Sequence, residues 1–365
     1  MVAVVGVGQW LLFSLGLDPT FRSIFHSMAQ VQGFLGCFAA GFLLTFIPRR
    51  TMTGPAQLWQ VVVCAMCPVM LCVFAWREQW ALAQVWWLIE MGVLLQFVIG
   101  RAAAMRRPLT TPASLVWVPL GLGFGLIGAV LTAMPSLHAL GKGLLLEGLM
   151  ASLVMGIGAM LVPVVTRAEP PKPLTRDALI LHGALAVAFA ASFVIQAEPM
   201  ASMRVGYGLR LVVASAVLVR GARLWVWPTE PGLNRRLVWF AAWCLPVGYL
   251  LLTLWPMQRS AGLHVIFIGG FSLLSMTIGH HVMAAHGGHQ AWLQGWAKAT
   301  IAMAAGTWVA MIARVMMQLD SANYLKWMTL AAVAFIASAG AWLLALYRMQ
   351  GAATETAPAP GLRTP

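Results

Sequence analysis

Charged side chains are scarce in this sequence. Only 10 of its 365 residues are acidic and 23 are Lys or Arg, so charged residues make up 9% of the chain. An average soluble protein contains about 25%. Apolar residues reach 61%, and a soluble fold could not hide so much apolar surface, because most of a domain's surface must face water. The composition excludes an ordinary soluble domain and indicates that lipid is the solvent.

Cysteine is sparse too, and its context excludes one kind of haem attachment. The five cysteines, all inside long apolar runs, are Cys37, Cys64, Cys67, Cys72 and Cys244. No Cys-x-x-Cys-His motif occurs, so covalent attachment of a c-type haem is not expected. Cys64 and Cys67 share one helix face near Met70, which could hold a soft ion such as Cu(I). Packing between helices is the favoured interpretation of these thiols.

The sequence is rich in apolar runs of helical length. In lipid the backbone must satisfy its own hydrogen bonds, which leaves helices or closed barrels, and barrel strands would alternate polar with apolar residues. The runs here are unbroken, and most are near the ~20 residues that a spanning helix needs. The predicted spans cover residues 2–17, 26–47, 58–76, 79–100, 114–133, 141–166, 177–195, 201–219, 236–255, 262–285, 296–318 and 323–347. We therefore predict an all-α, polytopic transmembrane bundle of about twelve helices.

Basic residues are unevenly distributed between the predicted connections. Connections after even-numbered spans carry pairs such as Arg49-Arg50, Arg106-Arg107 and Arg235-Arg236, whereas those after odd-numbered spans carry single residues such as Arg22. The positive-inside rule then places both termini in the cytoplasm. The net charge of +13 reflects this topology, and no nucleic-acid partner is expected.

The connections are too short to fold by themselves, which determines the predicted domain organisation. Residues 1–350 are expected to form one transmembrane helical domain in the lipid bilayer. Residues 351–365 are rich in Ala, Pro and Thr, and we expect them to form a disordered C-terminal tail.

The eight histidines are the main candidates for chemistry, because an ionisable residue in or beside a span is costly. The outer layer contains His26, His138 and His264, and the inner layer contains His182, His280, His281, His286 and His289. His264 and His286 are about 33 Å apart along one helix, so they cannot share a metal. His26 and His264 have matched depth on different helices, as a shared metal or haem requires. Interfacial histidines without a ligand are the alternative.

Four charged residues lie inside the predicted spans: Glu90, Glu147, Arg210 and Arg314. Each is expected to pair with an opposite charge or to face a cavity. Arg210 or Arg314 could bind haem propionates or an anionic substrate through paired hydrogen bonds. A structural ion pair with Glu90 or Glu147 fits the sequence equally well. The glycine-rich patches at 121–125 and 156–158 predict close helix packing.

Several segments resemble the NnrS family. His26, residues 32–35 and residues 40–48 together resemble the second-helix signature of that family, and residues 156–163 and 263–288 are similar to two further stretches. Its members are bacterial inner-membrane proteins linked to the response to nitric oxide and described as containing haem and copper. The resemblance covers essentially the whole chain. It implies a multi-pass protein of the bacterial inner membrane, with non-covalent b-type haem and copper as candidate cofactors.

The same resemblance implies a set of site residues. His26, His264 and His286 match positions of the family pattern and are candidate cofactor ligands, and Met28 joins His26 and His264 as a candidate metal ligand. The family usually has a His-x-His-Glu cluster where residues 26–29 of this chain are His-Ser-Met-Ala. Met28 could still bind Cu(I) or haem iron. Ala29 lacks the carboxylate that could orient a ligating histidine.

Three functions are consistent with these residues. The first is an NnrS-like protein that binds haem or metal and acts in the nitric oxide (nitrosative stress) response or in denitrification-associated metabolism, with the question of enzymatic turnover left open. The second is a cofactor-free secondary transporter or channel for a small anion or metabolite, although residues 1–176 and 177–365 show no repeat of the kind common in carriers. The third is a subunit associated with a respiratory or denitrification complex.

Overall fold

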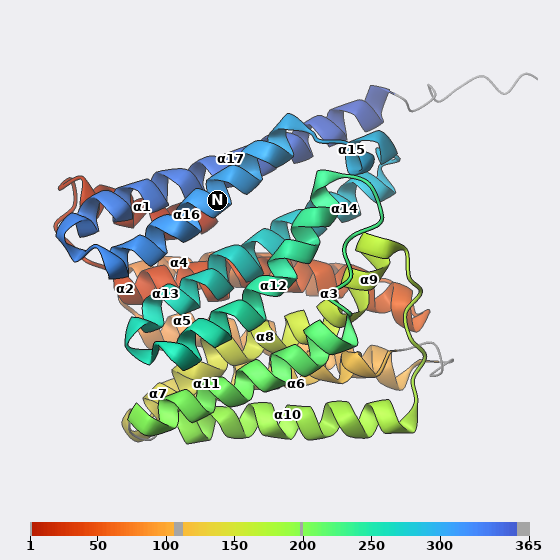
Figure 1. The fold of residues 1–365 in the computed structure, drawn as a ribbon, viewed down its shortest axis with the longest axis horizontal. Helices are drawn as coiled ribbons and strands as arrows, with labels where there is room; N and C mark the ends of the chain where they lie inside the picture. The colour runs from red at the N-terminus through yellow and green to blue at the C-terminus, as the bar shows by residue number, and fades with distance from the viewer. Residues whose placement is uncertain (1, 106–111, 198–199, 356–365) are drawn as a thin grey trace, which may run out of the picture.

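The fold is built from helices that run lengthwise, side by side (Figure 1). The structure is a computed structural model that describes residues 2–105, 112–197 and 200–355. Within these ranges no β-strand occurs, in agreement with the predicted all-α class. A helix satisfies its backbone hydrogen bonds within one segment, which is why apolar runs of ~20 residues adopt this structure in lipid.

The first half of the chain contains two long compound rods among simpler helices. Its elements are α1 (Val2–Ser14), α2 (Ser23–Ser27), η1 (Met28–Leu35), α3 (Gly36–Thr51), α4 (Leu58–Trp76), α5 (Trp80–Ala103), η3 (Ala113–Val116), α6 (Trp117–Thr132), η4 (Pro135–Leu137), α7 (His138–Gly143), η5 (Leu144–Gly148), α8 (Leu149–Leu153), η6 (Val154–Gly158) and α9 (Ala159–Arg167). The π-helical segments η1, η5 and η6 continue their neighbours without a break. The rods therefore run over Ser23–Thr51 and Pro135–Arg167.

The second half contains a third compound rod of the same kind. Its elements are α10 (Arg176–Gln196), α11 (Met200–Ala214), η7 (Ser215–Gly221), α12 (Leu233–Leu254), η8 (Pro256–Gln258), α13 (Arg259–His264), η9 (Val265–Ser272), α14 (Leu273–His286), α15 (Gln290–Gln294), α16 (Lys298–Leu319), η10 (Ser321–Asn323) and α17 (Tyr324–Glu355). The third rod runs over Pro256–His286 and contains the π-helical segment η9.

Ten of the helical stretches within the described ranges are long and apolar enough to cross a membrane. The first predicted span corresponds to the shorter apolar helix Val2–Ser14, and the eighth corresponds to α11 and η7. The predicted count of twelve spans and the cytoplasmic placement of both termini stay predictions. Helix α17 continues to Glu355, and the rest of the predicted disordered tail, like Arg106 and Arg107, lies outside the described residues.

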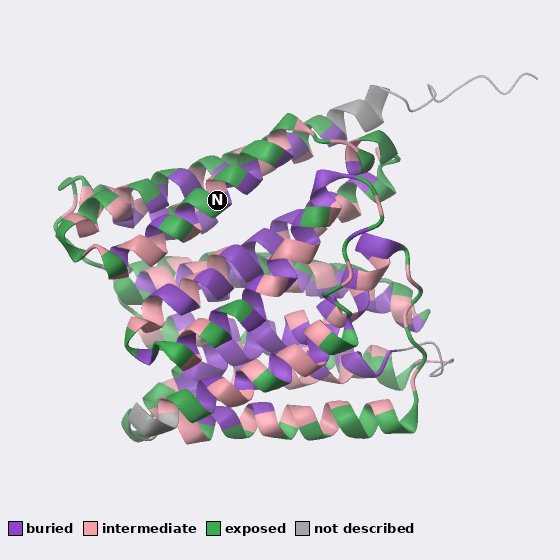
Figure 2. Ribbon diagram, viewed as in Figure 1, coloured by how far each residue is buried: buried purple, intermediate pink, exposed green. Residues whose placement is uncertain are grey.

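The three rods form the centre of the bundle. Their most apolar windows are 61%, 72% and 67% buried, whereas those of the other candidate spans are 17% to 56% buried. Three helices separate consecutive rods along the described chain, so the rods recur at a regular spacing. Figure 2 shows buried residues concentrated on the inner helices and exposed residues along α10.

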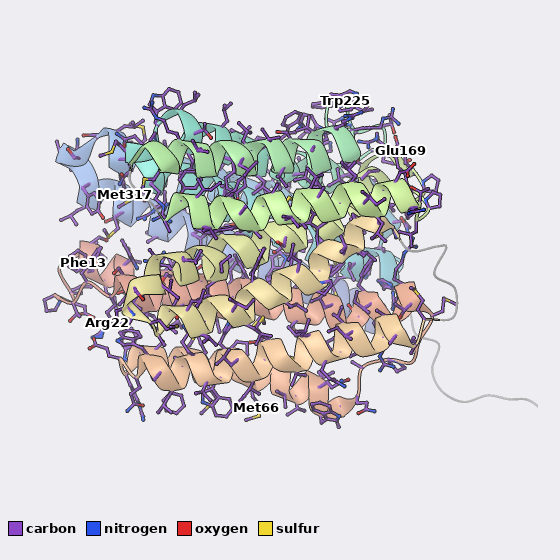
Figure 3. All side chains as sticks on the ribbon, turned by 90° about the horizontal axis from the view of Figure 1, so that it is seen from below. Phe13, Arg22, Met66, Glu169, Trp225 and Met317 are labelled. Atoms are coloured by element: carbon purple, nitrogen blue, oxygen red, sulfur yellow. The ribbon has the colours of Figure 1, made fainter. Side chains whose placement is uncertain are left out.

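The outer surface of the bundle is apolar along its length and polar at its ends. On α10 the side chains of Ile180, Val187 and Val194 are each at least 60% exposed, which fits a face turned toward lipid. Figure 3 shows Phe13, Arg22 and Met317 at one end, and Glu169 and Trp225 at the opposite end. The first end carries the connections with few basic residues, which the positive-inside rule predicts to lie on the outer side, so we call it the outer end.

Two glycine patches that predicted close helix packing do lie at helix contacts. A Cβ atom on Gly121 would meet the Leu149 carbonyl oxygen at 3.0 Å, and one on Gly156 would meet Trp117 Cβ at 3.0 Å. At both positions a larger residue would push helices apart. The packing interpretation is confirmed for these two glycines, whereas Gly123 faces open space.

Candidate functional site

A cavity of about 490 Å³ opens at the outer end, between the first and third rods. Side chains from α1, α2, η1, α7, η5, α13, η9, α16 and α17 line it. This volume is within the range of small-molecule and cofactor sites, about 300–1,000 Å³. We call it the outer pocket, and it includes His26, His264, Lys142, Arg259 and Arg314.

His26 is held by the first helix. Its Nδ1 lies 2.8 Å from the carbonyl oxygen of Gly6, and because a carbonyl only accepts, Nδ1 carries the proton. The Nε2 lone pair is then available to a ligand. Helix α1 can approach this closely because residue 6 is glycine, whose added Cβ would lie 2.9 Å from Ala29 Cβ. The ring also packs against Trp10, with ring centroids 4.7 Å apart.

His264 has the same protonation pattern with a different partner. Its Nδ1 donates to the Ser260 carbonyl one turn earlier on α13, at 2.6 Å. Among the described residues, neither His264 Nε2 nor His26 Nε2 has a hydrogen-bond partner. Both π-helical segments η1 and η9 begin within two residues of these histidines, and such segments are frequent at functional sites. The predicted meeting of His26 and His264 at one outer location is therefore what the structure shows.

Arg314 lines the same pocket as the two histidines. Its guanidinium carbon lies 5.1 Å from the centre of the Trp10 ring, and Trp10 itself packs against His26. The hydrogen bond of Arg314 goes to the thioether sulfur of Met317, at 3.0 Å. Within the described chain no carboxylate pairs with Arg314, so a half-buried positive charge faces the pocket without an anion.

Arg259 connects the outer pocket to a buried ion cluster. Glu147 accepts from Arg210 at 2.9 Å and from Arg259 at 3.2 Å, and Arg259 also donates to the Tyr207 hydroxyl at 2.7 Å. The structural ion pair considered for Arg210 is confirmed, and its partner is Glu147. One carboxylate against two guanidinium groups leaves this cluster with an excess positive charge.

A family model described as NnrS protein matches residues 1–350, nearly the whole chain. The chain belongs to the NnrS family. A search of curated proteins found no match. The family match agrees with the resemblance carried by His26 and by residues 32–35, 40–48, 156–163 and 263–288, and with a bundle of membrane-spanning length.

Met28 and Ala29 occupy the positions where this NnrS protein departs from the His-x-His-Glu pattern. Both side chains are buried, Met28 at 5% exposure and Ala29 at 0%. Neither lines the outer pocket in the described structure. Ala29 packs where α1 approaches η1 at Gly6, so a small residue here helps to bring the Gly6 carbonyl to His26. A metal-ligand role for Met28 stays a prediction.

Three of the inner histidines each contact a different set of neighbours. His286 donates from Nδ1 to the Val282 carbonyl at 2.7 Å, and its Nε2 is in contact with a guanidinium nitrogen of Arg49. His182 Nδ1 accepts from Trp117 Nε1 at 3.0 Å. His280 is fully buried between Trp292 and Trp342. A cofactor role for His286 would require Arg49 to release Nε2, and it stays a prediction.

Three further observations concern the other polar and ionisable side chains of the described chain. Among these residues no three His, Cys, Asp or Glu side chains form a group that could hold a metal ion. Glu90 is fully buried, and neither carboxyl oxygen has a hydrogen-bond partner in the described structure. At the outer end, Trp327 and Asn323 donate to Asp320 and lower the pKa of that carboxyl, which stabilises the turn between α16 and α17.

Sequence reasoning missed several residues of this site. Trp10, Gly6 and Ser260 contact the two imidazoles and Arg259 lines the outer pocket, but none of the four was a predicted site residue. Arg259 could have been found, because it lies five residues before His264 at the outer end of the same helix. Nothing in the sequence marks the Gly6 carbonyl, because its role depends on how α1 packs against η1.

Proposed function

We propose that this NnrS protein is a haem-binding protein of the bacterial inner membrane that acts in the nitric oxide response. The observation that carries the proposal is the outer pocket, where two imidazoles from separate rods each keep Nε2 free. A haem supplies four nitrogen ligands to its own iron, and its iron provides the site for redox and gas-ligand chemistry. Two free imidazoles thus suit a haem better than a bare copper ion, which the protein alone would have to ligate.

The charge around the outer pocket supports the same proposal. Arg314 has no carboxylate partner among the described residues, and Arg259 belongs to a cluster with excess positive charge. The carboxylates of a haem would supply the missing anions, bound by charge-assisted hydrogen bonds. In this assignment His26 and His264 would hold the iron, with one of the two imidazoles exchangeable for a gas ligand. Arg314 and Arg259 would hold the carboxylates, and Trp10 packs beside His26.

The family supports the nitric oxide part of the proposal. NnrS proteins are linked to the nitric oxide response, and this chain matches the family over residues 1–350. Nitric oxide is small and apolar, so it partitions into the bilayer and reaches a membrane-embedded site without a polar channel. The second candidate, an anion carrier, would use the same cations. It gains no specific support, because Arg210 is fully buried in its ion pair with Glu147.

The test is an absorption spectrum and metal analysis of protein purified in detergent from a haem-replete host. We expect a Soret band that His26→Ala or His264→Ala weakens strongly. His138→Ala is the matched control, because His138 also donates from Nδ1 to a backbone carbonyl, at 2.8 Å from Thr132 O, but does not line the outer pocket. Colourless, metal-free wild-type protein would overturn the proposal.

A further inference from the structure

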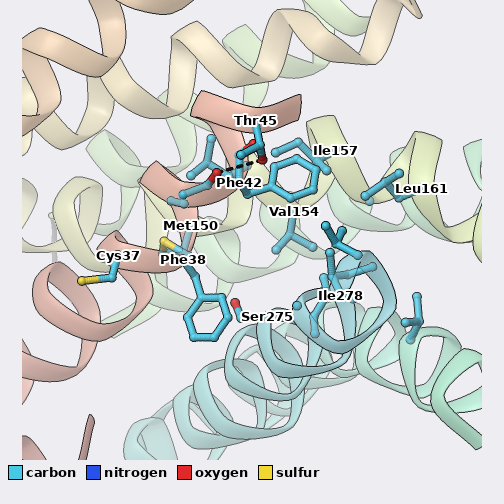
Figure 4. Close-up of a pocket in the computed structure, with 18 of the residues that line it drawn as sticks. Cys37, Phe38, Phe42, Thr45, Met150, Val154, Ile157, Leu161, Ser275 and Ile278 are labelled. Carbon is cyan, nitrogen blue, oxygen red and sulfur yellow. Dashed lines mark hydrogen bonds between the residues drawn. The ribbon is translucent and has the colours of Figure 1, made fainter. Parts of the chain in front are cut away.

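A second cavity, of about 440 Å³, lies further along the rods toward the inner end. It is lined by α3, by the segment from α8 to α9 and by α14 (Figure 4). Trp342 of α17 and Val238 of α12 also line it. We call it the inner cavity. All three central rods contribute to its wall, whereas the outer pocket has most of its wall from the first and third.

The wall of the inner cavity offers almost nothing to a polar ligand. No charged residue of the described chain lines it. The Thr45 hydroxyl already donates a hydrogen bond that is shared between the Gly41 and Phe42 carbonyls, at 2.9 and 3.0 Å. Trp342 Nε1 donates to Met276 O at 3.0 Å. The Ser275 hydroxyl and the weakly polar Cys37 thiol remain. A water molecule needs two to four polar partners, so the occupant is apolar.

One aromatic ring contacts residues of both the inner cavity and the outer pocket. Along the first rod, the outer pocket ends at Leu35 and the inner cavity begins at Cys37. The ring belongs to Phe34, which is 8% exposed and precedes Leu35 in the sequence. Its ring packs edge-to-face against Phe38 of the inner cavity, with centroids 5.3 Å apart, and against Phe335 of the outer pocket, at 6.1 Å.

The other side of the inner cavity faces the surface of the bundle. Gly41, Thr45 and Met283, all of which line it, are exposed. They belong to stretches long and apolar enough to span a membrane, so this side is turned toward lipid. An apolar gas dissolved in lipid could enter here without losing hydrogen bonds, and it is small enough to pass a single ring that moves. A lipid acyl chain could enter but could not pass Phe34.

We propose that the inner cavity takes up small uncharged gas molecules, such as nitric oxide or dioxygen, from the bilayer and delivers them past Phe34 to the outer pocket. The delivery step rests on the proposed function. The uptake step does not, because it depends only on the wall of the inner cavity.

Uptake is tested with xenon, which binds dry apolar cavities. Crystals of the full chain under xenon pressure should show a xenon peak among Phe38, Phe42 and Ile278. Gly41→Phe should abolish this peak, because a Cβ at Gly41 meets nothing within 4 Å and the ring can fill the cavity. Gly183→Phe is the matched control, since Gly183 also has open space around it and lies on α10. Ile278→Trp is a second filling variant if Gly41→Phe folds poorly.

Delivery is tested by mixing reduced, haem-loaded protein with dissolved nitric oxide and following the Soret band. We expect Gly41→Phe to slow the spectral change severalfold, Phe34→Leu to speed it, and Gly183→Phe to match wild type. Equal rates in all four proteins would overturn delivery. An ordered acyl chain in the inner cavity, with no xenon peak, would overturn uptake. A colourless protein would overturn the proposed function, while the xenon peak would still decide whether the cavity takes up gas.

Discussion

The two layers of histidines differ in the surroundings of the second ring nitrogen rather than in the bond made by the first. In both layers imidazoles donate to backbone carbonyls: His26 to Gly6 and His264 to Ser260 at the outer end, His286 to Val282 and His289 to Met349 at the inner end. At the outer end His26 and His264 line one shared cavity, and in neither does Nε2 have a hydrogen-bond partner among the described residues. At the inner end none of the histidines lines either of the two cavities described above. A ligand site requires both an imidazole that is oriented by a hydrogen bond and a cavity beside its other ring nitrogen.

Arg314 differs from the paired cations of the described bundle. At the inner end Arg167 pairs with Glu169 at 2.8 Å, and at the outer end Arg259 pairs with Glu147 at 3.2 Å. The described residues supply no carboxylate to Arg314. An unpaired, partly buried cation is costly unless a ligand completes it. This contrast indicates that Arg314 is placed to bind an anionic group.

The largest effect is expected for Glu147, the single carboxylate of the buried cluster. Glu147→Gln leaves Arg210 and Arg259 without a counter-charge, and breaking such a buried pair costs about 3–5 kcal/mol. Thermal unfolding in detergent, followed by tryptophan fluorescence, measures the loss. Glu90→Gln is the control: Glu90 is also fully buried, but its carboxyl has no hydrogen-bond partner in the described chain. Equal losses of stability in the two variants would show that the ion pairs of Glu147 contribute no more than the burial of Glu90.

The second-largest effect is expected on haem binding, when His26 loses the carbonyl that orients its ring. Gly6→Leu should displace α1 from η1, because a Cβ at this position collides with Ala29, and the Gly6 carbonyl would then leave His26 Nδ1. Loss of such an orienting partner typically weakens ligand binding by about 10–100-fold. Haem titration of the apoprotein measures it. Gly8→Leu on the same helix meets open space and should bind haem like wild type, and a similar loss there would show that α1 acts through general packing.

A smaller effect is expected for Arg314. Arg314→Gln removes the unpaired cation, and a hydrogen bond to a charged group contributes about 1.5–3 kcal/mol, so haem affinity should fall by about tenfold or more. Arg314→Lys keeps the charge but not the planar fork and should have an intermediate affinity. The exposed Arg77 provides the control variant Arg77→Gln. Unchanged haem affinity in Arg314→Gln would show that Arg314 is not part of the proposed haem site.

Much of the fold could be predicted from the sequence, because each span is a local property of composition. The predicted span at 58–76 coincides with Leu58–Trp76, and the span at 26–47 falls within Ser23–Thr51. The compound rods could not be predicted in this way. Their π-helical segments depend on contacts with other helices, and the central position of every fourth helix becomes visible only when burial is compared along the chain.

For the site, the sequence could predict the level of each residue along its helix, but it could not predict which residues on other helices it contacts. Residue spacing placed His26 and His264 at the same level, and the structure brings them to one pocket. Residue spacing could not decide whether Arg210 pairs with Glu90 or with Glu147. Helix packing brings Arg210 to Glu147. Spacing also placed His286 at the correct end of its helix but could not show that Arg49 occupies its free nitrogen.

The smallest effect is expected at the inner end, and it decides whether the two layers really differ in role. His289 Nε2 donates to the Met349 carbonyl at 2.8 Å and so ties the α14–α15 connection to α17. His289→Ala should lower stability by about 1 kcal/mol, the contribution of an ordinary hydrogen bond, and should leave the Soret band unchanged. Gln290→Ala, at the exposed neighbouring residue, is the control for stability. A weakened Soret band in His289→Ala would place cofactor chemistry at the inner end and would make the inner histidines a second ligand set.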